Sequence, residues 1–221
     1  MESLARNGLR TVLFTRVPTK DELAAAGGLV AFGIASHARS FSPAEMERTT
    51  RGDFERIKSL GAPIVHYKVC STFDSSPTIG SIGRAIDVGA DVFGTKCVPV
   101  VAGAPALGRY CAFGNLFARG SGEANPIRLD RHPNMSRHPV TPMNEADLRL
   151  HLAKQTDRAV GLLDLTQLAG KADEVAAKYE QLAAHVGVAL VDYLDANQTL
   201  RIGALLLKHA QREQRAERPL F

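Results

Sequence analysis

The sequence predicts a single α/β domain in which a mostly parallel sheet is flanked by helices on both faces. The chain has 221 residues, of which 45% are hydrophobic and 23% are charged, and these values are typical of a globular domain with one core. Short apolar runs alternate along it with longer amphipathic segments. Such alternation indicates βαβ units, whose strands are parallel and covered by helices.

The expected strands are the short apolar runs, many of them rich in β-branched residues. They cover residues 11–15, 29–35, 63–69, 98–102, 159–165 and 188–193.

The expected helices carry apolar residues at helical spacing. The first long one has clear end signals, because Ser42 suits the N-cap, Pro43 suits the first helical position and Gly61 suits a stop. A short helical segment is also expected at residues 2–8. The longer helices are expected at residues 43–60, 81–90, 144–155, 172–185 and 199–214.

Residues 103–143 show neither a helical nor a strand period. A segment of this length without regular structure is typical of a functional loop or of disorder. Phe113, Leu116, Phe117, Ile127 and Leu129 give it apolar side chains that can pack. We therefore expect a long functional loop that packs against the domain.

The pattern at both ends of the chain leads us to expect that the sequence is part of a longer protein. A helix in a doubly wound sheet normally follows a strand, yet no strand precedes residues 2–8. At the other end an apolar run starts at Pro219 and stops at Phe221.

Composition and charge exclude several classes of protein. A formal net charge of +4 is mild for this length and favours a small anion over nucleic acid as a partner. The three cysteines cannot pair completely and lack zinc-finger spacing. The N-terminus has no signal-peptide run, and no apolar stretch is long enough to cross a bilayer. We expect a cytoplasmic protein with neither membrane nor nucleic-acid partners.

A polar turn at residues 70–81 is the sharpest local signal. It follows the expected strand that ends in Lys68 and Val69, and it enters a helix through Gly80 and Ser81. Ligands of open α/β sheets bind outside the carboxyl ends of strands, and hydroxyl and carboxylate side chains suit a polyhydroxylated anion. The same residues are also common caps of any strand-to-helix turn, so both interpretations remain open.

Arg109 follows the expected strand 98–102 through a turn of proline and glycine. An arginine placed there can grip a carboxylate with two hydrogen bonds, although a surface arginine on a turn is the alternative. His132 and His138 both precede prolines, but their spacing does not support a metal site. The other histidines are scattered, and we expect them to be packed or solvated.

Taken together, several ordered blocks resemble a known family. They are residues 68–77, residues 80–83, residues 105–109, residues 114–117 and residues 138–143, which run from Lys68 to Met143. This set resembles the N-terminal, sugar-acid-binding domain of the four-carbon acid sugar kinase family, whose members phosphorylate threonate, erythronate or 3-oxo-tetronate-type acids with ATP. Residues 36–40 also resemble the family's Ser-Arg element.

The resemblance implies roles for particular residues. Lys68, Asp74, Ser75 and Ser76 would line the sugar-acid pocket. Arg39 and Arg109 would contact the carboxylate of the acid or the incoming phosphate, and His138 would shape the rim. Catalytic residues are not assigned.

The sequence departs from the family at both ends. Full-length relatives begin with a strand and an Asp-Asp-x-Thr-Gly element, and they continue into a nucleotide-binding domain. The resemblance therefore implies that residues 1–221 form the substrate-binding half of an ATP-dependent kinase, and that ATP, together with Mg, binds in the missing domain. An inactive sugar-acid-binding fragment and a protein-interaction remnant are the alternatives.

Overall fold

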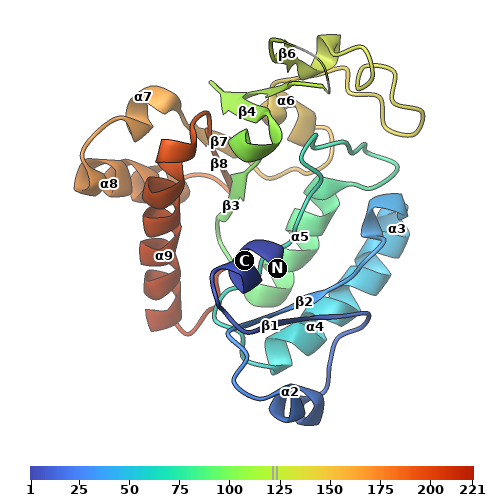
Figure 1. Cartoon of the computed structure of the whole chain (residues 1–221), viewed down its shortest axis with the longest axis vertical. Helices are drawn as coiled ribbons and strands as arrows, with labels where there is room; N and C mark the ends of the chain where they lie inside the picture. Colours follow the sequence, from blue (N-terminus) through green and yellow to red (C-terminus); the bar gives the residue numbers. More distant parts are fainter. Residues whose placement is uncertain (121, 123) are drawn as a thin grey trace.

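The computed structural model describes residues 1–120, 122 and 124–221. It confirms an α/β domain built of small, mostly parallel sheets with helices around them. Figure 1 shows a central sheet between helices, a second parallel pair at one end and an antiparallel sheet at the other.

Three parallel strands make the central sheet. They are β3 (Val98–Val101), β7 (Val160–Leu163) and β8 (Val188–Val191), in the order β3-β8-β7. All four residues of β8 are buried, as expected for a middle strand covered on both faces. Val188 and Leu190 belong to one core cluster and Ala189 and Val191 to the other, which is the two-residue period of a strand.

Helices cover both faces of this sheet (Figure 1). Helix α5 contributes to the core cluster with Val188 and Leu190, and α8 and α9 contribute to the other cluster. The helices are α1 (Glu2–Arg6), α2 (Lys20–Ala26), α3 (Pro43–Glu45), α4 (Arg51–Ser59), α5 (Ile82–Phe93), α6 (Leu148–Leu152), α7 (Leu165–Leu168), α8 (Ala172–Ala183) and α9 (Thr199–Arg215).

The helical stretch expected at 43–60 is confirmed, with its end signals. Ser42 forms a capping box with Glu45, and a π-helical turn at Met46–Thr50 joins α3 to α4. Helices α2 and α7 were not expected. Each begins at a capping box, Thr19 with Glu22 and Asp164 with Gln167.

The second parallel pair consists of β1 (Thr11–Phe14) and β2 (Ala31–Ile34). The strand expected at 63–69 is wrong. Among the described residues that segment makes only an isolated bridge, in which the Val65 N–H donates to Leu220 and the Leu220 N–H donates to Pro63. The parallel strands therefore form two separate sheets, because the segment has no further partner along its edges.

The expectation of no regular structure at 103–143 is also wrong. The segment holds an antiparallel sheet of β4 (Arg109–Ala112), β5 (Asn115–Ala118) and β6 (Ile127–Arg128). The turn between β4 and β5 has only two residues, Phe113 with φ 51° and Gly114 with φ 79°. Two positive φ values are the type I′ geometry that suits a tight hairpin. Residues 121 and 123 of this segment lie outside the described residues.

The helix expected at 144–155 is shorter than predicted. The Leu116 N–H donates to the Ala146 carbonyl, and Asn115 bridges Asp147, so these residues are held extended beside β5. Helix α6 begins only after Asp147, whose side chain accepts from the Arg149 N–H.

Candidate functional site

Two polar segments far apart in the sequence meet beside the start of α5. One follows β2 and contains Arg39, and the other is the 70–81 turn. The Gly80 N–H donates to the Phe41 carbonyl at 2.8 Å. Gly80 has a φ of +61°, and a Cβ there would lie 2.4 Å from the Arg39 carbonyl oxygen. Only glycine permits this approach, which fixes the two segments against each other.

Arg39 and Asp74 form an ion pair where the segments meet. Arg39 Nη2 lies 2.7 Å from Asp74 Oδ2, and the side chains are 65% and 4% exposed respectively. The other oxygen, Oδ1, accepts from Thr72 Oγ1 at 2.7 Å. A buried carboxylate thus holds an exposed guanidinium.

The charge state of Asp74 follows from opposing effects. Burial on its own would raise the pKa of this carboxyl, but hydrogen bonds from Cys70 and Thr72 and the charge of Arg39 outweigh it. The pKa of Asp74 therefore lies below its ordinary value, and the group is ionised at neutral pH.

Ser75 is buried and contacts α6 and the turn after it. Its Oγ lies 2.9 Å from His151 Nε2 and accepts from Gln155 Nε2 at 3.0 Å. Gln155 Oε1 in turn accepts from the Gly83 N–H at 3.2 Å and from Ser81 Oγ at 3.3 Å. One amide side chain thus links Ser75 to the first turn of α5.

His151 is neutral in this arrangement. Burial lowers its pKa to about 4, the charge of Lys154 adds to that effect and Glu145 opposes it. Because Gln155 Nε2 donates to His151 Nε2 at 2.9 Å, the proton lies on Nδ1. That atom is buried and has no hydrogen-bond partner among the described residues.

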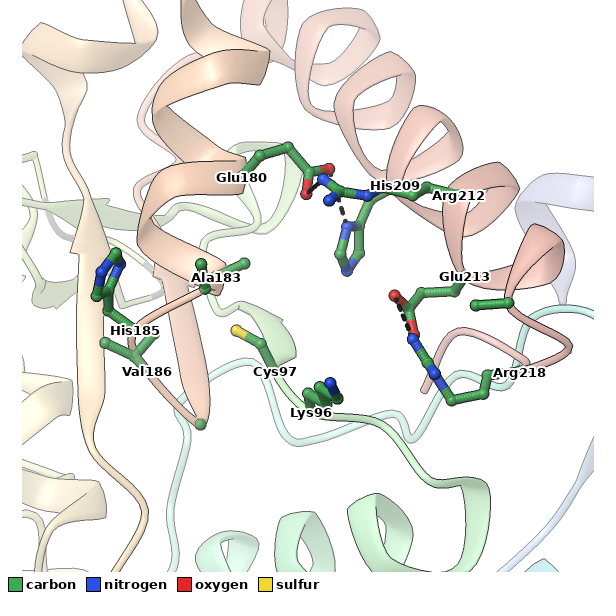
Figure 2. Close-up of a pocket in the computed structure, with 13 residues that line it drawn as sticks. Lys96, Cys97, Glu180, Ala183, His185, Val186, His209, Arg212, Glu213 and Arg218 are labelled. Carbon is green, nitrogen blue, oxygen red and sulfur yellow. Dashed lines mark hydrogen bonds and ion pairs between the residues drawn. The ribbon is translucent and has the colours of Figure 1, made fainter.

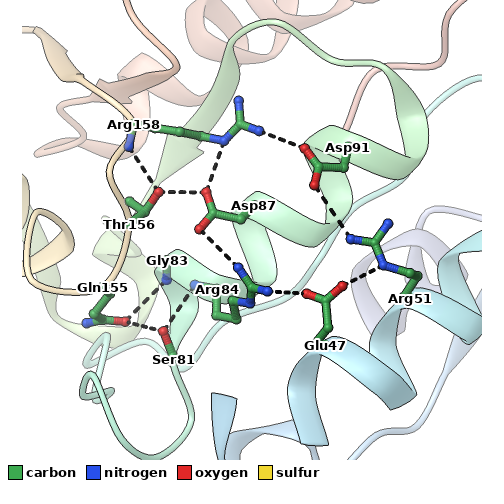
Figure 3. A network of polar contacts seen from close by, with 10 residues as sticks. All are labelled: Glu47, Arg51, Ser81, Gly83, Arg84, Asp87, Asp91, Gln155, Thr156 and Arg158. Atoms are coloured by element: carbon green, nitrogen blue, oxygen red, sulfur yellow. Dashed lines mark hydrogen bonds and ion pairs between the residues drawn. The ribbon is translucent and has the colours of Figure 1, made fainter. Parts of the chain in front are cut away.

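A network of ion pairs fixes α5 in place (Figure 3). Arg84 pairs with Glu47 at 2.6 Å, and Arg158 pairs with Asp87 at 3.0 Å and with Asp91 at 3.1 Å. These pairs join α5 to the helical stretch before it and to the segment before β7. The helix that carries Ser81 is therefore held from two sides.

Ser76 and Lys68, two further residues expected to line the acid site, have different surroundings. Ser76 Oγ accepts from the N–H groups of Thr78 and Ile79 at 3.2 and 2.9 Å, so it shapes the turn. Lys68 is exposed and makes no hydrogen bond or ion pair within the described part of the chain.

Arg109 and His138 make their hydrogen bonds elsewhere. Arg109 Nη1 donates to the carbonyls of Leu107 and Arg119 at 2.8 and 2.9 Å, within its own hairpin. His138 Nδ1 accepts from the Thr141 N–H at 3.0 Å. No interaction between described residues joins either side chain to Asp74.

Asp192 is a buried carboxylate that the sequence interpretation did not single out. It follows β8 and accepts from the N–H groups of Phe113, Gly114 and Leu165 at 2.6, 2.9 and 3.1 Å. Burial raises its pKa, and the three backbone hydrogen bonds oppose that rise. Asp192 thus fastens the β4–β5 hairpin at the carboxyl end of the central sheet.

His151 and Gln155 were missed as well. The available signal was their spacing of four residues in an expected helix, which places both side chains on one face.

Within the described residues no three His, Cys, Asp or Glu side chains are grouped so as to hold a metal ion. Among the same residues no helix has the length and apolar character that a membrane span needs.

Comparison with known proteins identifies the family. A family model described as a sugar-binding N-terminal domain matches residues 1–220. A 3-oxo-isoapionate kinase of Paraburkholderia graminis is 47% identical over 218 residues, which are 98% of this chain and 44% of that protein. The chain belongs to the four-carbon acid sugar kinase family.

Another relative and two solved structures are also similar to most of this chain. A 3-oxo-tetronate kinase of Methylobacterium radiotolerans is 32% identical over 93% of this chain and 46% of that protein. A crystal structure of a Salmonella typhimurium protein superposes with a TM-score of 0.81 and 25% identity, covering 92% of this chain and 47% of that one. A crystal structure of a Haemophilus influenzae protein superposes with a TM-score of 0.71 and 25% identity, covering 80% of this chain and 41% of that one. The chain spans less than half the length of each of these relatives.

Proposed function

We propose that this chain binds the substrate in a kinase that phosphorylates a small sugar acid of the threonate, erythronate or 3-oxo-tetronate type. The single observation that carries the proposal is the Arg39–Asp74 pair, in which a buried carboxylate presents an exposed guanidinium beside hydroxyl side chains. The family of the chain sets the reaction class, because the named relatives are kinases of 3-oxo acids.

Arg39 supplies the recognition of the acid group. A guanidinium has five N–H donors in a planar fork, and Asp74 occupies one nitrogen, so the other donors are free for a carboxylate. The positive charge also favours a carboxylate over a neutral sugar. Arg39 makes no other side-chain hydrogen bond within the described part of the chain.

Hydroxyl recognition falls to the 70–81 turn. Ser76 and Thr78 carry partly or fully exposed hydroxyls, and Lys68 carries a free ammonium group near the start of the same segment. We propose Lys68, Asp74, Ser75 and Ser76 as the lining of the acid site. Ser75 acts there through its hydrogen bonds, since it is 1% exposed.

Arg109 and His138 remain proposed contacts of the bound acid or phosphate at the rim. In the present structure both are held by local hydrogen bonds, so their participation requires those side chains to turn. The printed hydrogen bonds of the Arg109 side chain all come from Nη1, so the Nη2 donors have no hydrogen-bond partner among the described residues.

ATP and Mg are implied by the kinase relatives. Within the described residues no three His, Cys, Asp or Glu side chains are grouped as metal ligands, and the sequence contains neither of the phosphate-loop motifs GxxxxGK(S/T) and GxGxxG. Binding of the acid is what we assign to this chain, and phosphoryl transfer to residues outside it.

Calorimetry with threonate and erythronate tests the proposal. We expect saturable binding to the unaltered chain and at least tenfold weaker binding to Arg39→Gln, because a hydrogen bond to a charged group contributes about 1.5–3 kcal/mol. Arg10→Gln is the matched control, since Arg10 is exposed and its side chain makes no hydrogen bond with a described residue.

Two further measurements sharpen the test. Threitol, which lacks the carboxylate, is expected not to bind, and an assay of ADP release with ATP and either acid is expected to show no turnover by this chain alone. Equal affinity of Arg39→Gln and the unaltered chain for both acids would contradict the assignment of Arg39.

A further inference from the structure

A cavity lies at the amino ends of two strands of the central sheet (Figure 2). Its volume is about 710 Å³, within the range of small-molecule sites. Lys96 and Cys97 line it just before β3, and Val186 and Gly187 line it just before β8. It therefore opens at the amino ends of these strands, whereas Asp192 follows the carboxyl end of β8.

The inner surface of the cavity is apolar and small. Cys97 is 4% exposed, and Ala183, Ala184 and Val186 stand beside it. Burial raises the pKa of the Cys97 thiol to about 12, so the sulfur is an uncharged part of this surface. Such a surface suits the carbon skeleton of a ligand.

The rim of the cavity carries more positive than negative side chains. Lys96, Arg212 and Arg218 are cationic, while Glu180 and Glu213 are the carboxylates among the described residues that line the cavity. Figure 2 shows these side chains around one opening, with Lys96 across from the two glutamates.

Both carboxylates are already matched by cations. Glu180 lies between His209, at 3.2 Å, and Arg212. Glu213 accepts from Arg218 Nε at 2.9 Å. Lys96 is exposed and has no hydrogen-bond or ion-pair partner in the described part of the chain. The unmatched charge of this cavity is therefore a cation.

We propose that this cavity binds a small organic anion, a phosphate ester or a di- or tricarboxylate. Its charged group contacts Lys96, and the free donors of Arg212 and Arg218 assist, while its carbon skeleton covers Cys97 and Val186. The site is distinct from the acid site at Arg39 and Asp74, because no residue that lines the cavity belongs to segments 36–41 or 68–81.

Titrations with inorganic phosphate and with citrate at constant ionic strength test this site. Binding is measured by calorimetry and by the shifts of the amide NMR signals of residues 96 and 187. We expect saturable binding of at least one probe, at least fivefold weaker binding to Lys96→Ala, and no detectable binding to Lys96→Glu. Lys20→Ala removes an exposed lysine of α2 and is the matched control. Because Lys96 has no partner to lose, thermal unfolding of the variants without anion is expected to match the unaltered chain.

The two probes and the variant Arg39→Gln separate the outcomes. Preference for phosphate indicates a phosphate ester, and preference for citrate indicates a polycarboxylate. Arg39→Gln is expected to leave this binding intact, so failure here and failure of the acid-site proposal are distinguishable. Unchanged affinity in Lys96→Ala, loss of binding in Arg39→Gln, or no saturable binding of either probe overturns the inference.

Discussion

His151 Nε2 lies 2.9 Å from Ser75 Oγ, although the two residues are 76 positions apart in the sequence. The contact joins α6, which follows the antiparallel sheet, to the turn that carries Asp74. The Arg39–Asp74 pair therefore depends on a helix with no other part in the acid site. Exchange of either partner is expected to move the turn and not only to remove one hydrogen bond.

The neutral state of His151 makes stability depend on pH. Its folded pKa of about 4 lies below the ordinary 6.5, so the unfolded chain binds more protons between these values. The stabilisation is complete above pH 6.5 and is lost as pH falls towards 4, by about 3 kcal/mol in total. Urea unfolding across this range is expected to give a smaller pH slope for His151→Gln than for the unaltered chain.

Identical pH slopes for His151→Gln and the unaltered chain would contradict the prediction, because they would show that the pKa of His151 is not lowered in the folded state.

Gly80→Ala is expected to destabilise the fold by about 2 kcal/mol or more. The substitution places a methyl group 2.4 Å from the Arg39 carbonyl oxygen at a φ of +61°. Gly52 in α4 is the matched control, since a Cβ there meets nothing within 4 Å, and Gly52→Ala is expected to stabilise by about 0.5–1 kcal/mol. Urea unfolding of both variants measures the difference, and equal effects would exclude the close approach.

Asp192→Asn is expected to destabilise the chain by about 1–3 kcal/mol, because an amide replaces a buried carboxylate that accepts from three backbone N–H groups. Hydrogen exchange at Phe113 and Gly114 is expected to accelerate as the hairpin loosens. Asp173→Asn is the control, since the Asp173 side chain is 98% exposed. Unchanged protection in Asp192→Asn would show that the hairpin is held by other contacts.

Asp74→Asn is expected to lower the free energy of unfolding more at neutral pH than in acid. The folded pKa of Asp74 is lowered, so the stabilisation from its charge is present above the unfolded value of 3.8 and is lost as pH falls through the folded value. The difference in unfolding free energy between the variant and the unaltered chain should therefore shrink below pH 4. A difference that stays constant down to pH 2 would refute the ionised state.

Helices and strands whose apolar pattern and end signals lie within their own segment could be predicted from the sequence. Strand β8 is a continuous apolar run whose four residues are all buried, and the 43–60 helix has its own N-cap in Ser42. The 63–69 strand was wrong for the opposite reason. Apolar alternation predicts an extended chain, but a strand also requires a partner edge, and here only Ile64 finds one, at Leu220.

The hairpin and the deeper half of the candidate site depend on tertiary contacts that no local pattern contains. Phe113 is an unusual residue for a positive φ, and its N–H is accepted by Asp192, 79 residues away. His151 likewise gains its role only when Ser75 reaches it. Motif resemblance did place Arg39 and Asp74 among the candidates, because those segments carry their polar residues in sequence order.

The carboxylate of Asp192 accepts hydrogen bonds from main-chain N–H groups of the hairpin. These hydrogen bonds therefore do not depend on which side chains stand at the tip of the hairpin. Phe113 is 54% exposed there. Natural variation or deliberate redesign can therefore alter what the tip presents to solvent while its anchorage persists. Residue 113 is accordingly a convenient place to attach a spectroscopic label that reports on this end of the molecule.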